Sequence, residues 1–151
     1  AFIFIFLLKC KTHNNNCKYL SVMIVNVKYD NSGLSDEQKE VIHEFIKFIQ
    51  KDEPLDQDFQ IIFLGDRVGH MTTGSRTDKH VLKILSQGRM LIDVLRTLIH
   101  EWTHEYQHQK FNDEFKKDIG GKSENYANIK SGILLKKFQK EFPQFLGLIY
   151  Q

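Results

Sequence analysis

One stretch of the chain, residues 98–108, constrains the rest most strongly. It contains the pattern His-Glu-x-x-His, which begins at His100 and ends at His104. Residues four apart lie on one face of an α-helix, so the two imidazoles can converge on a single ion. Neutral imidazole is a good zinc ligand, and a catalytic zinc has three protein ligands and an open position for water. Glu101 lies beside that position, where a carboxylate can accept the proton of the water.

The phase of the predicted helix separates these histidines from its apolar side. The helix is expected to begin near Asp93, an acceptable N-cap. At 100° per residue, His100 and His104 lie roughly 160° from the centre of the apolar stripe. They are therefore not expected to be core histidines, and the remaining alternative to a metal site is a solvated polar face. The stripe consists of Leu95, Leu98, Ile99, Trp102 and Tyr106.

The third ligand has several candidates. His108 continues the spacing of four, but it lies roughly 12 Å along the helix from His100. Because Zn–N bonds are about 2.1 Å long, one ion cannot join that outer pair. The continuation His-x-x-Gly-x-x-His of metzincins is absent. Asp113, Glu114 and Asp118 follow in a connecting loop, where carboxylates are usually solvated.

Glu124 is better placed to complete the site. It falls in the first turn of the last predicted helix, after a reversal at Gly120-Gly121 that can bring the two helices antiparallel. The small residues Ala127 and Ser131 follow on nearly the same face and allow a close approach. Asn125 or Asn128 could hydrogen-bond the carboxylate or a ligand histidine.

Composition limits the class of protein. A chain of 151 residues with 41% hydrophobic and 26% charged residues is typical of one soluble globular domain. The net charge is +2 and no basic stripe with interleaved aromatics occurs, so nucleic-acid binding is not expected. Two cysteines, Cys10 and Cys17, do not support a disulfide scaffold. We expect a cytoplasmic monomer that acts on no membrane.

The first 22 residues differ from the rest. An apolar run from Phe2 to Leu8 is too short to span a bilayer, which needs about 20 residues. It also has no clear basic region before it and no clear cleavage site after it. We expect residues 1–22 to be an extension outside the domain, with Met23 as a plausible start. The alternative is a degenerate signal or anchor, so secretion is not excluded.

The remaining residues, 23–151, predict a single α+β domain. The expected strands are 22–29, 59–64 and 80–85, and residues 67–78 are expected to form an exposed loop or loose hairpin. A helix is expected after Ser35, whose spacing from Gln38 is that of a capping box. The resulting fold is a small, mostly antiparallel sheet packed on this N-terminal helix, the His-Glu-x-x-His helix and a C-terminal ligand-bearing helix.

Two segments together resemble a known family. Residues 92–107 (IDVLRTLIHEWTHEYQ) and 123–132 (SENYANIKSG) look like the small His-Glu-x-x-His metallopeptidases encoded by tailed phages and related viruses. These resemble minimal gluzincins, with a wider similarity to ImmA/IrrE-type and SprT-like peptidases. The resemblance extends from Phe59 to Phe138, including the Gly69–Gly74 segment and the strand after it. Ser131 stands where alanine is commoner, and the first 22 residues have no counterpart.

The resemblance implies a zincin-like fold with one zinc ion on His100, His104 and Glu124. Glu101 would be the general base for hydrolysis of a protein or peptide substrate. Strand 80–85, if it forms the sheet edge above the helix, would hold that substrate by strand addition. If the chain is phage-encoded, it would act in the host-cell cytoplasm.

Two other interpretations remain at the level of sequence. The chain could be a catalytically inactive, zinc-stabilised interaction module of viral origin, although a structural zinc site does not need Glu101. It could also be a metal-free helical protein. A donor to the oxyanion is expected in a peptidase. The sequence does not choose among Arg67, His70, Tyr106 and Tyr126 for that role.

Overall fold

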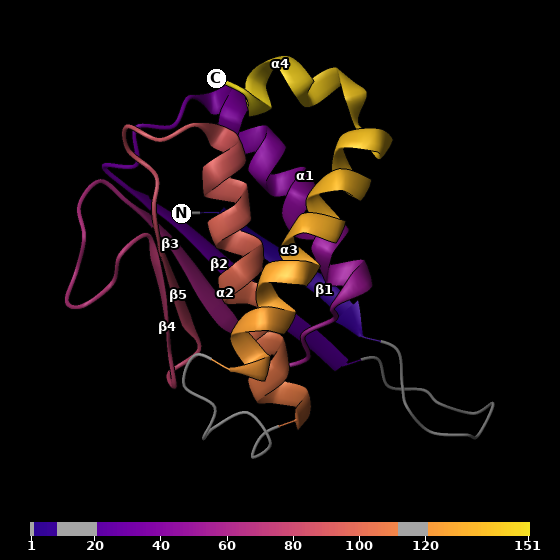
Figure 1. The fold of residues 1–151 in the computed structure, drawn as a ribbon. Helices are drawn as coiled ribbons and strands as arrows, with labels where there is room; N and C mark the ends of the chain where they lie inside the picture. Colours follow the sequence, from indigo (N-terminus) through magenta and orange to yellow (C-terminus); the bar gives the residue numbers. More distant parts are fainter. Residues whose placement is uncertain (1, 9–20, 112–120) are drawn as a thin grey trace.

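The computed structural model describes residues 2–8, 21–111 and 121–151 (Figure 1). Its strands are β1 (Phe2–Leu8), β2 (Ser21–Asp30), β3 (Phe59–Leu64), β4 (Gly74–Thr77) and β5 (Val81–Leu85). Its α-helices are α1 (Asp36–Asp52), α2 (Leu91–Phe111), α3 (Lys122–Glu141) and α4 (Leu146–Ile149), with a short 3₁₀ helix, η1 (Pro143–Phe145). The predicted α+β class is confirmed.

The sheet is mixed, where a mostly antiparallel sheet was expected. Its strand order is β1-β2-β3-β5-β4. The two central pairs, β2 with β3 and β3 with β5, are parallel, and the two outer pairs are antiparallel. A parallel pair needs a crossover connection, and α1 provides it between β2 and β3. The order of the strands along the sequence does not show which of them pair in parallel.

The helices gather on one side of the sheet, as Figure 1 shows. Every second residue of a strand therefore enters the core, as Met23, Val25 and Val27 of β2 do. The capping box at Ser35 and Gln38 is present as predicted, and it begins α1. The same side of the sheet receives the apolar faces of α1 and α2, which places the opposite, polar face of α2 outside the core.

Part of the segment 1–22, which was predicted to be an extension outside the domain, forms strand β1 of the sheet. β1 pairs with β2 over its whole length, from Phe2 opposite Val27 to Leu8 opposite Ser21. Phe4 is buried against the core, whereas Ile3 and Ile5 are exposed. The alternation of an inward and an outward residue is that of an edge strand with one packed face. Cys10 and Cys17 fall outside the described residues.

The other edge of the sheet also differs from expectation. The predicted loop or loose hairpin contains β4, which pairs with β5 and forms the edge. β5, the strand expected at the edge, is instead internal between β3 and β4. The short, glycine-containing β4 has no apolar alternation, so its sequence did not reveal a strand.

The last third of the chain packs on the body. α3 begins at Lys122, after Gly121 at its N-cap. The C-terminal residues then return to the start of α2, where Ile149 is buried and the Leu91 amide donates to the Gln151 carbonyl. Within the described ranges, no helix is both long and apolar enough to cross a membrane.

Candidate metal centre

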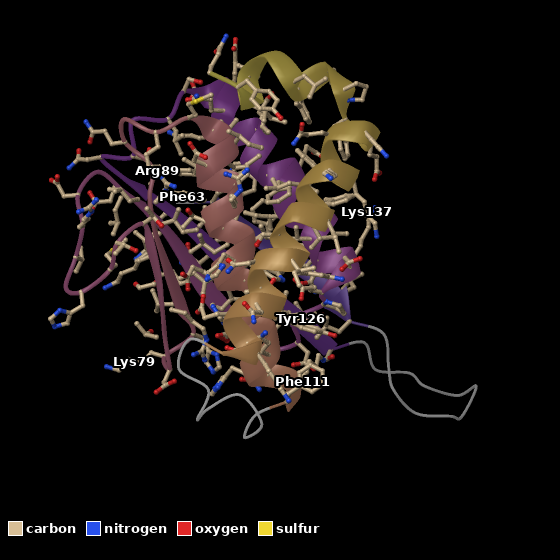
Figure 2. The ribbon with its side chains drawn as sticks, in the orientation of Figure 1. Phe63, Lys79, Arg89, Phe111, Tyr126 and Lys137 are labelled. Atoms are coloured by element: carbon tan, nitrogen blue, oxygen red, sulfur yellow. The ribbon has the colours of Figure 1, made fainter. Side chains whose placement is uncertain are left out.

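The centre is built on α2, which runs from just after Arg89 to Phe111 (Figure 2). Its apolar stripe is in the core as predicted, and the indole Nε1 of Trp102 donates to the Glu53 carbonyl at 3.0 Å. This burial fixes the rotation of α2 about its axis. The residues of the stripe that have no exposed surface are Leu95, Leu98, Ile99 and Trp102.

Three side chains from α2 and α3 come together on the polar face. The Nε2 atoms of His100 and His104 lie 3.1 Å apart. The carboxylate of Glu124 reaches both, with Oε2 at 3.2 Å from His100 Nε2 and Oε1 at 2.8 Å from His104 Nε2. The three donor groups lie within 4.8 Å of one another, so they could hold one metal ion. The structure thus joins the three residues that the sequence proposed for this purpose.

The dimensions of this group suit a small divalent ion. In a tetrahedral site with bonds of about 2.0–2.1 Å, ligand atoms lie roughly 3.3–3.4 Å apart. The observed separations need only a slight expansion to reach that geometry. Burial, followed by the charge of His104, lowers the pKa of His100, while Glu124 and Asn128 raise it. The result favours the neutral imidazole that a metal requires.

Gln107 orients the second histidine, and sequence reasoning missed it. Its amide oxygen can only accept, so the Nδ1–H of His104 donates to it at 3.0 Å. This leaves the lone pair of His104 Nε2 for the metal group. The amide nitrogen of Gln107 donates in turn to the Ser123 carbonyl at 3.2 Å, which ties the start of α3 to α2. The only signal in the sequence was its position three residues after His104.

The small residues on α3 allow the helix to approach as expected. Ala127 and Ser131 are both buried, and Ser131 Oγ donates to the Ala127 carbonyl at 2.6 Å. Both asparagines proposed to support a ligand are exposed, and of the two only Asn128 is near enough to His100 to raise the pKa of its imidazole. Lys130 anchors α3 further along, with its Nζ 2.8 Å from Asp52 Oδ2 of α1.

Glu101 lies on the opposite flank of the metal group, beneath β4. A Cβ added to Gly74 would lie 2.6 Å from Thr97 Cγ2 and 3.0 Å from Glu101 Cγ, so the strand backbone lies directly on α2. Burial raises the pKa of Glu101 to about 7; the nearby Glu124 also raises it, whereas His104 and Arg76 lower it. A carboxyl group with this pKa can both accept and release a proton near neutral pH.

The rejected ligand candidate His108 does not join the group. Its ring lies beside that of His80, with centroids 6.0 Å apart, at the β4–β5 turn. The loop carboxylates Asp113, Glu114 and Asp118 fall outside the described residues.

The four candidate oxyanion donors lie on three different parts of the fold. Arg67 and His70 are exposed in the loop before β4. Tyr126 is exposed on α3, where Figure 2 shows it, and Tyr106 is half-buried on α2.

No family model, no curated protein and no solved structure matches this chain. The family resemblance of residues 92–107 and 123–132 therefore has no support beyond the residues themselves. The observations that bear on function are the convergence of His100, His104 and Glu124 and the position of Glu101 beneath β4.

Proposed function

We propose that the chain is a zinc-dependent metallopeptidase with a minimal, gluzincin-like site in a zincin-like fold. One observation carries the proposal: His100, His104 and Glu124 converge within 4.8 Å, beside a glutamate whose pKa is raised to about 7. Two imidazoles and one carboxylate form a known ligand set of catalytic zinc sites, which leaves one position for water.

The metal would be held by His100, His104 and Glu124. A zinc ion bound there supplies Lewis acidity, which lowers the pKa of water toward 7 and polarises a carbonyl group. Gln107 keeps the Nε2 lone pair of His104 directed at the ion, and Asn128 supports His100. These contacts would hold the ligand side chains in place around the ion.

Glu101 is proposed as the general base. Its carboxylate takes a proton from the attacking water and returns it to the amine nitrogen as the peptide C–N bond breaks. The carboxylate is regenerated at the end of each cycle. A dication nearby would favour the ionised form of Glu101 and lower its pKa.

The proposed substrate is an extended segment of a protein or peptide. β4 (Gly74–Thr77) is an edge strand next to Glu101, so its outer backbone groups can pair with such a segment. This assigns to β4 the role that the sequence suggested for residues 80–85. We further propose that the enzyme acts as a monomer in the cytoplasm, or in the host cytoplasm if it is phage-encoded.

Substitution of Glu101 by Gln tests this function. The Zn²⁺-loaded wild type and Glu101→Gln are each incubated with a quenched fluorogenic peptide library, and Zn²⁺ affinity is measured by chelator competition. We expect unchanged affinity and a fall in hydrolysis of at least about 100-fold, because general-base catalysis contributes typically 10²–10⁴-fold. Glu40→Gln, at an exposed position of α1, controls for the loss of one negative charge.

Two results would contradict the proposal. If Glu101→Gln hydrolyses peptides as fast as the wild type, Glu101 is not the base. If both bind Zn²⁺ and neither hydrolyses any peptide, the alternative of an inactive, zinc-stabilised interaction module is favoured.

A further inference from the structure

A second glutamate on α2 takes no part in the metal group. Glu105 follows Glu101 by one helical turn on the same flank, and its side chain has no exposed surface. Arg76 Nε donates to its Oε2 at 2.6 Å, and Gln109 Nε2 donates to its Oε1 at 3.1 Å. His80 Nδ1 also hydrogen-bonds Oε1. We call Glu105 with Arg76, His80 and Gln109 the Glu105 network.

The Glu105 network attaches the β4–β5 hairpin to α2 at two points. Arg76 belongs to β4, and His80 ends the turn that leads into β5. His80 has a φ of 60°, a left-handed conformation that is uncommon for residues other than glycine. Its amide donates to the Thr77 carbonyl at 3.1 Å, and its ring is bound to Glu105. One buried carboxylate therefore holds both sides of the turn.

The position of β4 in turn determines the surroundings of Glu101. Gly74 and Arg76 are two residues apart and face the same side of the strand, toward α2. The Gly74 backbone lies so close to Thr97 and Glu101 that even a methyl group would overlap them. β4 has only four residues and pairs only with β5 among the described strands, so its ladder alone is a weak attachment.

We propose that Glu105 is a positioning residue: through Arg76 and His80 it holds β4 against α2 and thereby fixes Glu101 beside the metal group. The inference rests on the proposed function insofar as Glu101 is the base. The attachment of β4 by Glu105 does not depend on catalysis and can be measured separately.

The primary test is Glu105→Gln, which keeps the size of the side chain and removes its charge. Hydrogen exchange of the amides of residues 73–81 reports whether β4 is loosened, and chelator competition reports Zn²⁺ affinity. Steady-state kinetics use the peptide that the Zn²⁺-loaded wild type cleaves fastest. We expect faster exchange in 73–81, unchanged Zn²⁺ affinity, and a kcat lower by on the order of 10–100-fold with little change in KM, because small misplacements of a catalytic group are this costly.

A second variant covers the case that Glu105→Gln does not fold, since it leaves the Arg76 charge buried. His80→Asn removes one of the three contacts to Glu105, and asparagine tolerates the left-handed backbone of that position. We expect a smaller change in the same direction in both exchange and kcat. Glu40→Gln is again the control for charge.

The outcomes separate the two proposals. Unchanged exchange in 73–81 and unchanged kcat in either folded variant would overturn the role of Glu105. A fall in kcat that is matched by a fall in Zn²⁺ affinity would also overturn it, because the defect would then lie in the metal group. If the wild type hydrolyses no more than Glu101→Gln, the proposed function fails, and the exchange data alone decide whether Glu105 holds β4.

Discussion

The two flanks of α2 each contain a buried glutamate, and the two are held differently. On the β4 flank, Glu105 accepts from Arg76, Gln109 and His80. Toward α1 and α3, Glu53 is equally buried but accepts only the Thr103 hydroxyl, at 2.7 Å. The other carboxylate oxygen of Glu53 is buried and has no partner among the described residues.

The two flanks of α2 also contribute different parts of the candidate site. On the α3 flank, short polar side chains join two helices, as Gln107 and Glu124 do, and the metal group forms where they meet. On the β4 flank, a charged network holds a short strand, and the proposed base lies beneath a glycine of that strand. Metal affinity should therefore depend on the α3 flank, and catalysis should depend on both flanks.

The largest expected effect concerns the α3 flank. Glu124→Ala should lower Zn²⁺ affinity by more than about 100-fold, because loss of a residue that only orients a ligand already costs roughly 10–100-fold. Chelator competition measures this. His108→Ala is the matched control, and its affinity should equal that of the wild type. An unchanged affinity in Glu124→Ala would show that Glu124 is not a metal ligand. It would also contradict the expectation that metal affinity depends on the α3 flank.

The next effect concerns the orientation of His104. Gln107→Leu keeps the approximate volume of the side chain but removes the acceptor for His104 Nδ1 and the donor to the Ser123 carbonyl. Zn²⁺ affinity should fall by roughly 10–100-fold. The exposed Gln144→Leu should leave affinity unchanged. Equal affinities in the two variants would show that His104 is oriented without Gln107.

The third effect compares two glycines by the same substitution. Gly74→Ala should reduce the free energy of unfolding by about 1–3 kcal/mol and also reduce hydrolysis, because the new methyl group overlaps Thr97 and Glu101. Gly132→Ala, in α3 with nothing within 4 Å of the new methyl, should increase stability by about 0.5–1 kcal/mol. Chemical denaturation measures both. If the free energy of unfolding increased in Gly74→Ala, as it is expected to do in Gly132→Ala, β4 would not pack closely on α2.

The smallest effect depends on pH and concerns Glu53. Burial raises the pKa of Glu53 above its usual value, although Thr103 and Lys130 lower it. The stability that protonated Glu53 contributes is therefore complete below its unfolded pKa and is lost as the pH rises through its folded pKa. Glu53→Gln should leave stability nearly unchanged at pH 4 and increase it at pH 8.

Chemical denaturation of Glu53→Gln and of the exposed control Glu40→Gln at both pH values measures this difference. A stability difference that is the same at pH 4 and pH 8 would show that Glu53 does not retain its proton on folding.

The local features of the sequence were sufficient to predict α2 and the two candidate metal ligands on it. The spacing of His100 and His104, and their angle to the apolar stripe, follow from 3.6 residues per turn and do not require a fold. The capping box before α1 and the strand 59–64 were equally local, and both are present as predicted. Glu124 could be named because the small residues after it indicate a helix that approaches another closely.

The two sheet edges, in contrast, depended on their partners. The apolar run Phe2–Leu8 gave no indication that its strand pairs with β2, because an apolar run has the same composition in an extension and in an edge strand. β4 was not predicted because its glycine and polar residues are typical of a loop. Only its position between β5 and α2 makes it a strand.

By itself, the sequence determined the kind of chemistry that α2 can support, because ligand identity and helical spacing are local properties. Only the tertiary structure decided what completes and supports that site. Gly74 and Arg76 of β4 lie against Glu101 and Glu105 of α2, and Gln107 ties His104 to the start of α3, so these roles depend on distances between elements. Gly74 acts because it lacks a side chain, and Arg76 acts by binding a residue of another element. Neither role produces a periodic pattern in the sequence.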